Sequence, residues 1–269
     1  MMAYLMTPDA PNLTVVVPCY NEAQRLDAGP LLEFAGGNPG ANLLFVNDGS
    51  TDTTADRLAE VAAQRPDRVR VMTLEPNGGK AEAVRRGMRA ALDAGAQVVA
   101  YLDADLSTPP LELARVGAAL ARPGIQVAVG ARVALRGTDI ERSAVRHYLG
   151  RVFASLASLI LRARIYDTQC GAKLFRATPA LRAALAEPFI SRWAFDIELL
   201  GRMLAGTGGE PPLPLAGIVE VPLHTWHDVK GSKLGPGAMA RTLLELGRIG
   251  ADLARRRRVN GGAANVGRA

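Results

Sequence analysis

The chain has 269 residues, 48% of them hydrophobic and 22% charged, which is sufficient for one large domain or two small ones with a substantial core. Two cysteines exclude a disulfide scaffold and fit a reducing cytoplasm, and no apolar stretch reaches the roughly 18 to 20 residues that span a bilayer. Residues 230–269 carry nine Lys and Arg against two acids, so with a net charge of +6 the remainder of the chain carries −1. A basic tail on a neutral body argues against a dedicated nucleic-acid binder and indicates contact with anionic surfaces or phosphates.

Apolar runs alternate with helical patterns along the first half of the chain. The runs that predict buried strands are residues 13–18, 43–46, 69–74 and the segment that starts at Val98. Helices are predicted over residues 53–64 and from Ala81 onward. This alternation predicts an α/β fold with a mostly parallel sheet, right-handed connections and helices on both faces. Ligands of such sheets bind at the carboxyl ends of the strands.

Polar or glycine-rich segments follow all four predicted strands at that edge. They are residues 18–22, Asp48, residues 78–80 and residues 103–105 with the pair Asp103 and Asp105. Each segment alone has an alternative interpretation as a turn or a helix cap. A glycine turn that opens a helix, followed by a lysine, also suits a diphosphate. Because four such segments fall at one edge of the sheet, the sequence predicts a ligand site there.

Asp103 and Asp105 are separated by one residue at the end of the fourth strand. Because side chains alternate along an extended chain, the two carboxylates project the same way and repel each other unless a cation or a proton lies between them. Mg²⁺ and Mn²⁺ take such oxygen ligands together with substrate phosphates. The alternative is a turn in which Ser107 or Thr108 caps a helix that starts at Pro109, with both acids solvated.

Four segments resemble, in this order, the signature of family 2 inverting glycosyltransferases with a GT-A fold: VVVPCYNE, FVNDGSTD, EPNGGKAEAVRRGM and YLDADLSTPP. The resemblance covers residues 13–230, and the ordered set is specific although no single segment is. Within the family, the later segments DTQCGAKLF, RWAFDIELL and HTWHDVKGSKL look closest to the polyprenyl-phosphate (dolichyl-phosphate-type) glucosyltransferases.

This resemblance implies a role for each part of the predicted edge. Residues implied in nucleotide-sugar binding are Pro18, Tyr20, Asn21, Glu22, Asp48, Gly79, Lys80, Asp103, Ala104 and Asp105. Asp103 and Asp105 would also hold Mg²⁺ or Mn²⁺, and Ser107 stands where many relatives have Gln, which leaves a third protein ligand open. Residues implied near the acceptor or a phosphate are Arg132, Arg146, Gln169 and Lys233. Asp196 corresponds to the family's candidate catalytic base.

The second half of the chain completes the predicted domain. The expected elements are strands at residues 125–130, 172–175 and 219–222, the last at an edge, a long amphipathic helix over 145–160 and a final helix from about residue 236. The final helix is expected to end in Arg255–Arg258, before a disordered tail; these arginines are either solvated or contact anionic lipid. His224 or His227 could complete the metal site, although a lone histidine is more often structural. We expect an extension over 1–12, a GT-A domain over 13–233 and a basic helix and tail over 234–269.

The function that the resemblance implies is transfer of a hexose, with inversion, from a nucleotide diphosphate sugar to a polyprenyl phosphate. Glucose from UDP-glucose is preferred, with GDP-mannose or a soluble hydroxyl acceptor as alternatives, and with a nucleotidyltransferase or a nucleotide-sugar sensor as weaker ones. A phosphate acceptor is already ionised, so Asp196 would position it rather than act as an essential base. We expect a cytoplasmic protein with peripheral contact at the inner face of the cell membrane.

Overall fold

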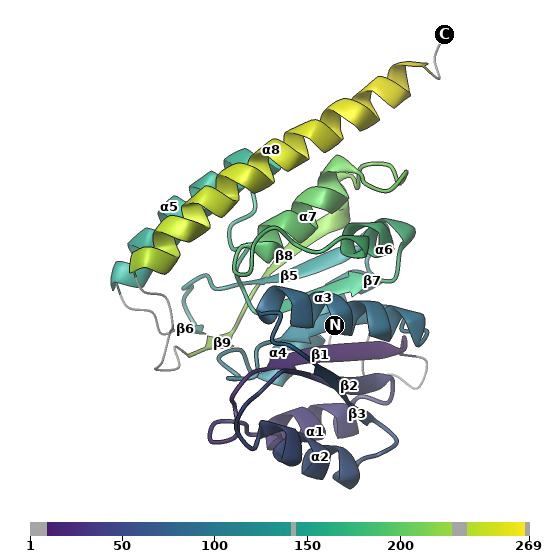
Figure 1. Ribbon diagram of the computed structural model, residues 1–269, viewed down its shortest axis with the longest axis vertical. Helices are drawn as coiled ribbons and strands as arrows, with labels where there is room; N and C mark the ends of the chain where they lie inside the picture. The colour runs from purple at the N-terminus through teal and green to yellow at the C-terminus, as the bar shows by residue number, and fades with distance from the viewer. Residues whose placement is uncertain (1–9, 141–143, 228–235, 267–269) are drawn as a thin grey trace.

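The computed structural model describes residues 10–140, 144–227 and 236–266, with side chains over residues 10–140, 153–227 and 242–260. Its centre is a seven-stranded sheet (Figure 1). In spatial order the strands are β3 (Val69–Leu74), β2 (Ala41–Asp48), β1 (Leu13–Cys19), β4 (Val98–Leu102), β7 (Ala172–Arg176), β5 (Val127–Ala131) and β8 (Ile218–Pro222). β7 is antiparallel to β4 and β5, and the remaining pairs are parallel, which confirms the mostly parallel sheet.

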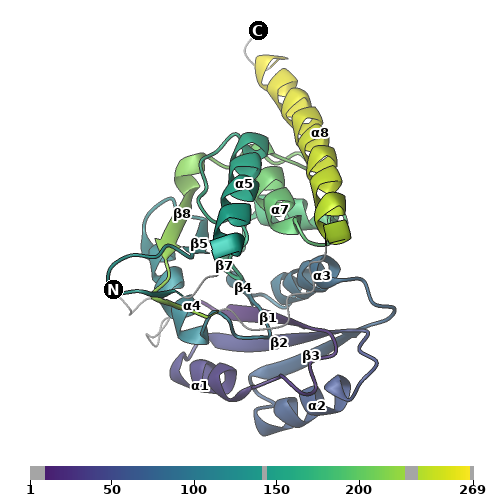
Figure 2. The ribbon, with the colours of Figure 1, turned by 90° about the vertical axis from the view of Figure 1, so that its left-hand side faces the viewer.

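Helices cover both faces of this sheet, as the sequence predicts. The helices packed in the core on one face are α1 (Gly29–Gly37), α2 (Thr54–Gln64) and α4 (Pro110–Gly117). Those on the other face are α3 (Lys80–Asp93), α6 (Pro179–Ala186), α7 (Phe195–Ala205), α5 (Ala144–Leu161) and α8 (Pro236–Val266). Figure 2 shows α5, α7 and α8 together, away from α1 and α2. Two short 3₁₀ turns, Ala118–Ala121 and Leu215–Gly217, and a small sheet of β6 (Asp139–Ile140) and β9 (Thr225–Trp226) complete the described elements.

Alternation along the central strands builds the two cores. In β1, Val15 and Val17 pack into the core that contains α1, α2 and α4, whereas Val16 packs into the core that contains α3. All three side chains are fully buried. An apolar run without polar interruption therefore reads as a strand buried on both faces, and its carboxyl end is free to carry the polar groups of a site.

The predicted edge strand is confirmed, because β8 pairs with β5 alone and ends the sheet. The predicted long helix also matches α5 closely. None of the helices in the described ranges is both long enough and apolar enough to cross a bilayer.

The C-terminal helix extends beyond its predicted end at Arg258, to Val266. Leu246, Ile249 and Leu253 lie in the same core as α7, so this helix packs on the sheet domain. Asn260 donates a hydrogen bond to the Ala205 carbonyl oxygen at 2.9 Å, and α8 is thereby tied to the end of α7. The structure continues this helix over residues 259–266, where a tail was expected, and Asn260 ties it to α7.

Candidate active site

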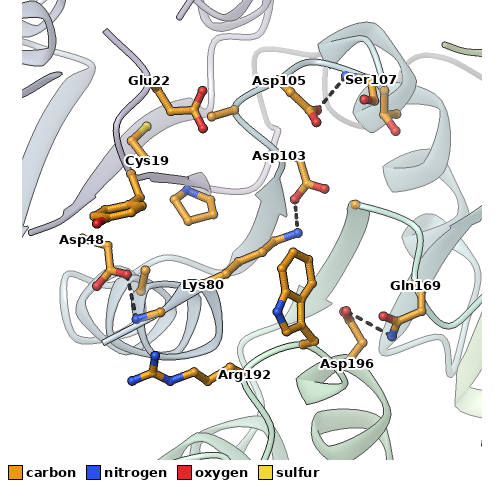
Figure 3. A pocket seen from close by; sticks show the side chains of 18 of the residues that line it. Cys19, Glu22, Asp48, Lys80, Asp103, Asp105, Ser107, Gln169, Arg192 and Asp196 are labelled. Atoms are coloured by element: carbon orange, nitrogen blue, oxygen red, sulfur yellow. Dashed lines mark hydrogen bonds and ion pairs between the residues drawn. The ribbon is translucent and has the colours of Figure 1, made fainter. Parts of the chain in front are cut away.

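A pocket of about 520 Å³ opens at the carboxyl ends of β1, β2 and β4. The predicted site residues that line it are Pro18, Tyr20, Glu22, Asp48, Gly79, Lys80, Asp103, Ala104, Asp105, Arg132, Gln169 and Asp196. Figure 3 shows how several of these side chains converge from separate loops. The four polar segments that the sequence places at one sheet edge do meet there.

Three predicted residues are not brought into the pocket by the described structure. Asn21 lies beside it with φ +53°, and its Oδ1 accepts a hydrogen bond from the Thr51 backbone N–H at 2.9 Å, so its side chain links the loops after β1 and β2. Arg146 lies in α5, where the structure does not describe its side chain. Lys233 lies outside the described residues.

Asp48 holds the glycine turn that opens α3. Its two carboxylate oxygens accept hydrogen bonds from the backbone N–H groups of Gly78 and Gly79, both at 2.8 Å, and from the Asn77 side chain at 3.0 Å. Gly79 has φ +87°, a conformation that favours glycine. The two glycine N–H groups expected to meet a diphosphate are therefore already bonded to Asp48. Lys80, the first residue of α3, is left as the charged group of this turn.

Lys80 reaches across the pocket to the acid pair. Its Nζ lies 2.6 Å from Asp103 Oδ1. Burial acts to raise the pKa of Asp103, but the Lys80 ammonium, together with Lys173 and Arg132, holds that pKa below its ordinary value. The Asp103 carboxylate also lies against the backbone of Gly171, where a Cβ atom would come within 2.6 Å of Oδ2. The site therefore requires a glycine at this position.

The acid pair suits a divalent cation by the chemistry of its donors. Asp103 and Asp105 both line the pocket, and the Asp105 carboxylate also accepts a hydrogen bond from the Ser107 N–H at 3.0 Å. Within the described residues, no third His, Cys, Asp or Glu joins them in a potential metal cluster. His224 and His227 are absent from the pocket lining, and His227 Nε2 lies 3.2 Å from Asp139. A metal held here would take its other ligands from substrate phosphates and water.

Asp196 enters the pocket from the first turn of α7 and is held by buried partners. Its Oδ1 accepts hydrogen bonds from the Tyr101 hydroxyl and from Lys173 Nζ, the latter at 2.9 Å. Its Oδ2 lies 3.5 Å from the Gln169 side-chain nitrogen. Burial raises the pKa of Asp196 to about 8. The carboxylate is thus fixed on its inner side and faces the pocket through Oδ2.

Arg132 lies beyond the end of β5 and forms a two-pronged ion pair with Asp167. Its Nε and one terminal nitrogen lie 2.7 and 2.8 Å from the two carboxylate oxygens. The guanidinium carbon is 5.2 Å from the centre of the Trp226 ring, a cation–π distance. Burial acts to raise the pKa of Asp167, but Arg132 outweighs it and lowers that pKa to about 2. Arg132 is therefore a rigidly held cation in the pocket wall.

The sequence model of "Glycosyl transferase family 2" matches residues 14–182 of the chain. The chain belongs to this family. It is therefore a glycosyltransferase, and the relatives whose sequences match it show which members it resembles.

The dolichyl-phosphate beta-glucosyltransferase of Drosophila melanogaster is 35% identical over 85% of this chain and 71% of its own length. The human protein of the same name is 34% identical over 85% of this chain and 72% of its own length. The polyprenol monophosphomannose synthase of Mycolicibacterium smegmatis is 30% identical over 71% of each chain.

Solved structures with the same fold are more distant in sequence. Glucosyl-3-phosphoglycerate synthase from Mycobacterium tuberculosis, crystallised with UDP, superimposes with a TM-score of 0.64 over 90% of this chain and 80% of its own, at 21% identity. Another crystal structure of that synthase contains Mn²⁺, UDP-glucose and glycerol 3-phosphate, with a TM-score of 0.62 and 20% identity. At this identity the likeness establishes the GT-A fold.

Several pocket residues of this glycosyltransferase were not predicted from its sequence. Arg192 and Trp193 line the pocket from the loop before α7, and the Arg192 side chain passes over Gly79, where a Cβ atom would come within 3.3 Å of its Cδ. The sequence signal that could have identified them is the Arg-Trp pair shortly before Asp196, the acid predicted for the site. Lys173 was missed because it stands in an apolar strand, where an isolated lysine is itself a sign of a buried charge partner.

Proposed function

We propose that this enzyme transfers glucose from UDP-glucose to the phosphate of a polyprenyl phosphate, with inversion at the anomeric carbon. The observation that carries the proposal is one pocket with two chemically different sides. Lys80, Asp103 and Asp105 line it from the segments after β3 and β4, and Arg132 and Asp196 line it from the segment after β5 and the start of α7. The likeness to dolichyl-phosphate beta-glucosyltransferases over most of the chain supports the glucosyl donor and the lipid acceptor.

On the donor side, Asp103 and Asp105 would hold Mg²⁺ or Mn²⁺. When bound, the metal would supply positive charge to the diphosphate as it leaves. The structural neighbour with Mn²⁺ and UDP-glucose supports a divalent ion in this fold. Lys80, 2.6 Å from Asp103, is placed to bring a second positive charge to the same oxygens. Tyr20 and Glu22 would hold the nucleoside at the pocket wall next to β1.

On the acceptor side, a phosphate oxygen would attack the sugar carbon directly. A phosphate monoester is ionised near neutral pH and needs no proton removed, so a strong general base is not required. This agrees with an Asp196 carboxylate whose Oδ1 is already occupied by Tyr101 and Lys173. Arg132 and Gln169 would then orient the acceptor phosphate. The fork of Arg132 already holds Asp167, so Arg132 would contribute its positive charge and its remaining N–H groups.

The membrane would deliver this acceptor, and we propose that α8 contacts its anionic inner face. Three exposed arginines, Arg248, Arg255 and Arg258, share the outer side of α8 with Leu244, which is 73% exposed, because the four residues follow one another at spacings of four, seven and three. Of the two acids of the helix, Glu245 accepts a hydrogen bond from Ser191, and Asp252 pairs with Arg256 and also with Arg255 of this face. Three arginines against this one acid leave the face with a positive charge. A basic face with an exposed leucine fits anionic lipid.

The lipid contact expected from Arg255–Arg258 as a block needs revision in two positions. Arg256 pairs with Asp252 and Glu187, and Arg257 donates hydrogen bonds to the carbonyl oxygens of Ile160 and Leu161 at 3.0 Å. Because these two side chains contact Glu187 and the end of α5, they hold α8 on the domain and do not face the membrane. The contact therefore includes Arg248 in their place.

A transfer assay tests the proposal. Labelled UDP-glucose and labelled GDP-mannose are offered in parallel with a polyprenyl phosphate in detergent micelles, with Mn²⁺ or Mg²⁺. The expected product is a β-linked glucosyl lipid phosphate formed from UDP-glucose. A mannosyl lipid formed from GDP-mannose at a higher rate would instead identify the enzyme as a mannosyltransferase, the alternative function that the mannose synthase relative favours. No lipid product from either donor would contradict the proposal.

A further inference from the structure

Lys173 is buried in the centre of the domain, directly behind the pocket. It stands on β7, opposite Tyr101 of β4 in the strand register, and its exposed fraction is 0%. Side chains of such a cross-strand pair project from the same face of the sheet. The first turn of α7 covers this face and brings Asp196 onto both of them. The fold therefore assembles a lysine, a tyrosine and an aspartate that lie far apart in sequence.

The contacts of Lys173 match those of a charged ammonium. Its Nζ lies 2.8 Å from the Tyr101 hydroxyl oxygen, 2.9 Å from Asp196 Oδ1 and 2.5 Å from the Cys170 carbonyl oxygen. Three acceptors use all three N–H groups of an ammonium. The Tyr101 hydroxyl in turn donates a hydrogen bond to Asp196 Oδ1. Oδ1 thus accepts two hydrogen bonds from behind the pocket, and Oδ2 faces the pocket beside Gln169.

The charge of Asp196 is balanced within this cluster. A carboxylate buried without a partner would carry a large desolvation cost. Burial alone opposes the charged form of both groups, since it raises the pKa of Asp196 to about 8 and lowers that of Lys173 to about 8. The 2.9 Å contact between Lys173 Nζ and Asp196 Oδ1 places opposite charges together in the cluster. The other charged pair that faces Asp196, Lys80 and Asp103, is balanced by its own 2.6 Å contact. An anionic acceptor therefore meets no net negative charge from these four groups.

We infer that Lys173 is a positioning residue for the acceptor: it orients the Asp196 carboxylate and cancels its charge, so that an anionic phosphate can lie beside it. This inference rests on the proposed phosphate acceptor. It assigns a function to the one fully buried lysine among the described residues. It also explains how an acid can line a pocket meant for an anion, since an uncompensated carboxylate there would repel the acceptor.

The test combines Lys173→Met with Asp196→Asn. Methionine keeps much of the length of the lysine and removes its charge, and asparagine removes the charge that needs balancing. We expect Lys173→Met to raise the KM for the phosphate acceptor about tenfold, the order of effect expected of one uncompensated charge within a few ångströms. The KM for the donor stays near that of the wild type. In the Asp196→Asn background, the same substitution should change the acceptor KM less than twofold.

Equal increases of acceptor KM in both backgrounds would overturn the inference, because a structural role of Lys173 does not depend on the Asp196 charge. If Lys173→Met fails to fold, Tyr101→Phe takes its place, since it removes one hydrogen bond to Oδ1 and keeps the ring that packs 5.7 Å from Phe195. It should raise the acceptor KM and leave the donor KM unchanged; a rise in donor KM alone would contradict the inference.

Both polyprenyl phosphate and 3-phosphoglycerate are offered, and the variants are compared on the acceptor that the wild type uses. Transfer to 3-phosphoglycerate alone would refute the lipid acceptor. The effect of Lys173→Met on the acceptor KM would then be measured with 3-phosphoglycerate, so the Lys173 inference would still be tested. Normal transfer to lipid with an unchanged acceptor KM in Lys173→Met would refute the Lys173 inference alone.

Discussion

Lys80 Nζ lies 2.6 Å from Asp103 Oδ1, so an ammonium rests against the carboxylate proposed to hold the metal. The contact keeps Asp103 ionised, since the pKa of Asp103 is held below its ordinary value despite burial. An ionised carboxylate is ready to bind a divalent ion as soon as the ion and the donor arrive. Lys80 would then be free to meet the donor phosphates.

Asp105→Asn should lower turnover by at least about a hundredfold, because it removes the charge of a proposed metal ligand. The measurement is the rate of glucosyl transfer across a Mn²⁺ titration. Asp56→Asn, an exposed aspartate on α2, is the matched control and should leave the rate unchanged. A variant with near-normal rate at low Mn²⁺ would show that Asp105 is not a ligand.

Gly171→Ala should displace the Asp103 carboxylate, since the new Cβ would come within 2.6 Å of Oδ2. We expect a loss of activity of at least about tenfold from this misplacement, with the fold retained. Gly37→Ala serves as the control, because a Cβ there meets nothing within 4 Å. Circular dichroism checks the fold, and calorimetric titration with Mn²⁺ and UDP measures the site. Wild-type activity and binding in Gly171→Ala would contradict the close approach.

The local parts of the fold could be predicted because they depend on neighbouring residues. The apolar run of β1 alternates into two cores through Val15, Val16 and Val17, and the polar edge follows directly from where such strands end. The antiparallel direction of β7 could not be predicted in this way. Its direction depends on pairing with β4 and β5, and a short apolar strand carries no signal of the orientation of its partners.

Site geometry was predicted less well, because partners distant in sequence decide it. Asp48 was implied in nucleotide-sugar binding and does line the pocket, but its hydrogen bonds from the N–H groups of Gly78 and Gly79, some thirty residues later, were not predicted. Asp196 was found from its motif, but Lys173 behind it was not. The helix beyond Arg258 was missed for the same reason, since Asn260 is held by α7.

The pair of Arg132 and Asp167 makes stability depend on acid pH. The folded-state pKa of Asp167, about 2, lies below its unfolded value of 3.8, so the folded state holds fewer protons between those values. The contribution of the pair, about 2 kcal/mol, is therefore complete above pH 4 and lost as the pH falls toward 2. Denaturant unfolding of the wild type and of Asp167→Asn at several pH values should show their difference shrinking over this range.

A control for this pH effect is Asp93→Asn, which breaks an exposed pair with Arg182. Exposed pairs contribute about 0 to 1 kcal/mol, so this variant should stay close to the wild type at every pH. If the free energies of unfolding of the wild type and Asp167→Asn differed by the same amount at pH 2.5 and pH 6, the lowered pKa of Asp167 and its cause, the pair with Arg132, would be contradicted.

Replacement of Arg248, Arg255 and Arg258 by Gln should weaken binding to vesicles of anionic lipid by about a hundredfold, since each charge contributes about 1 kcal/mol near such a surface. Sedimentation with phosphatidylglycerol vesicles measures the binding, and salt should weaken it for the wild type. The matched control replaces three exposed arginines elsewhere, Arg57, Arg70 and Arg122, with the same change of net charge. Equal loss in both triple variants, or a change in oligomeric state confined to the α8 variant, would contradict the lipid contact.

The most direct measurement of the central claim is a competition between acceptors in one reaction. UDP-glucose labelled in the sugar is supplied with Mn²⁺, a polyprenyl phosphate in micelles and 3-phosphoglycerate at equal concentration, and the products are separated by solvent extraction and counted. If the two-sided pocket serves a lipid phosphate, most of the label enters the organic phase as a β-glucosyl lipid, and Asp196→Asn reduces this by about tenfold from mispositioning. Label that remains in the aqueous phase as a glucosylated phosphoglycerate, or a loss of a thousandfold or more in Asp196→Asn with donor binding intact, would contradict the account.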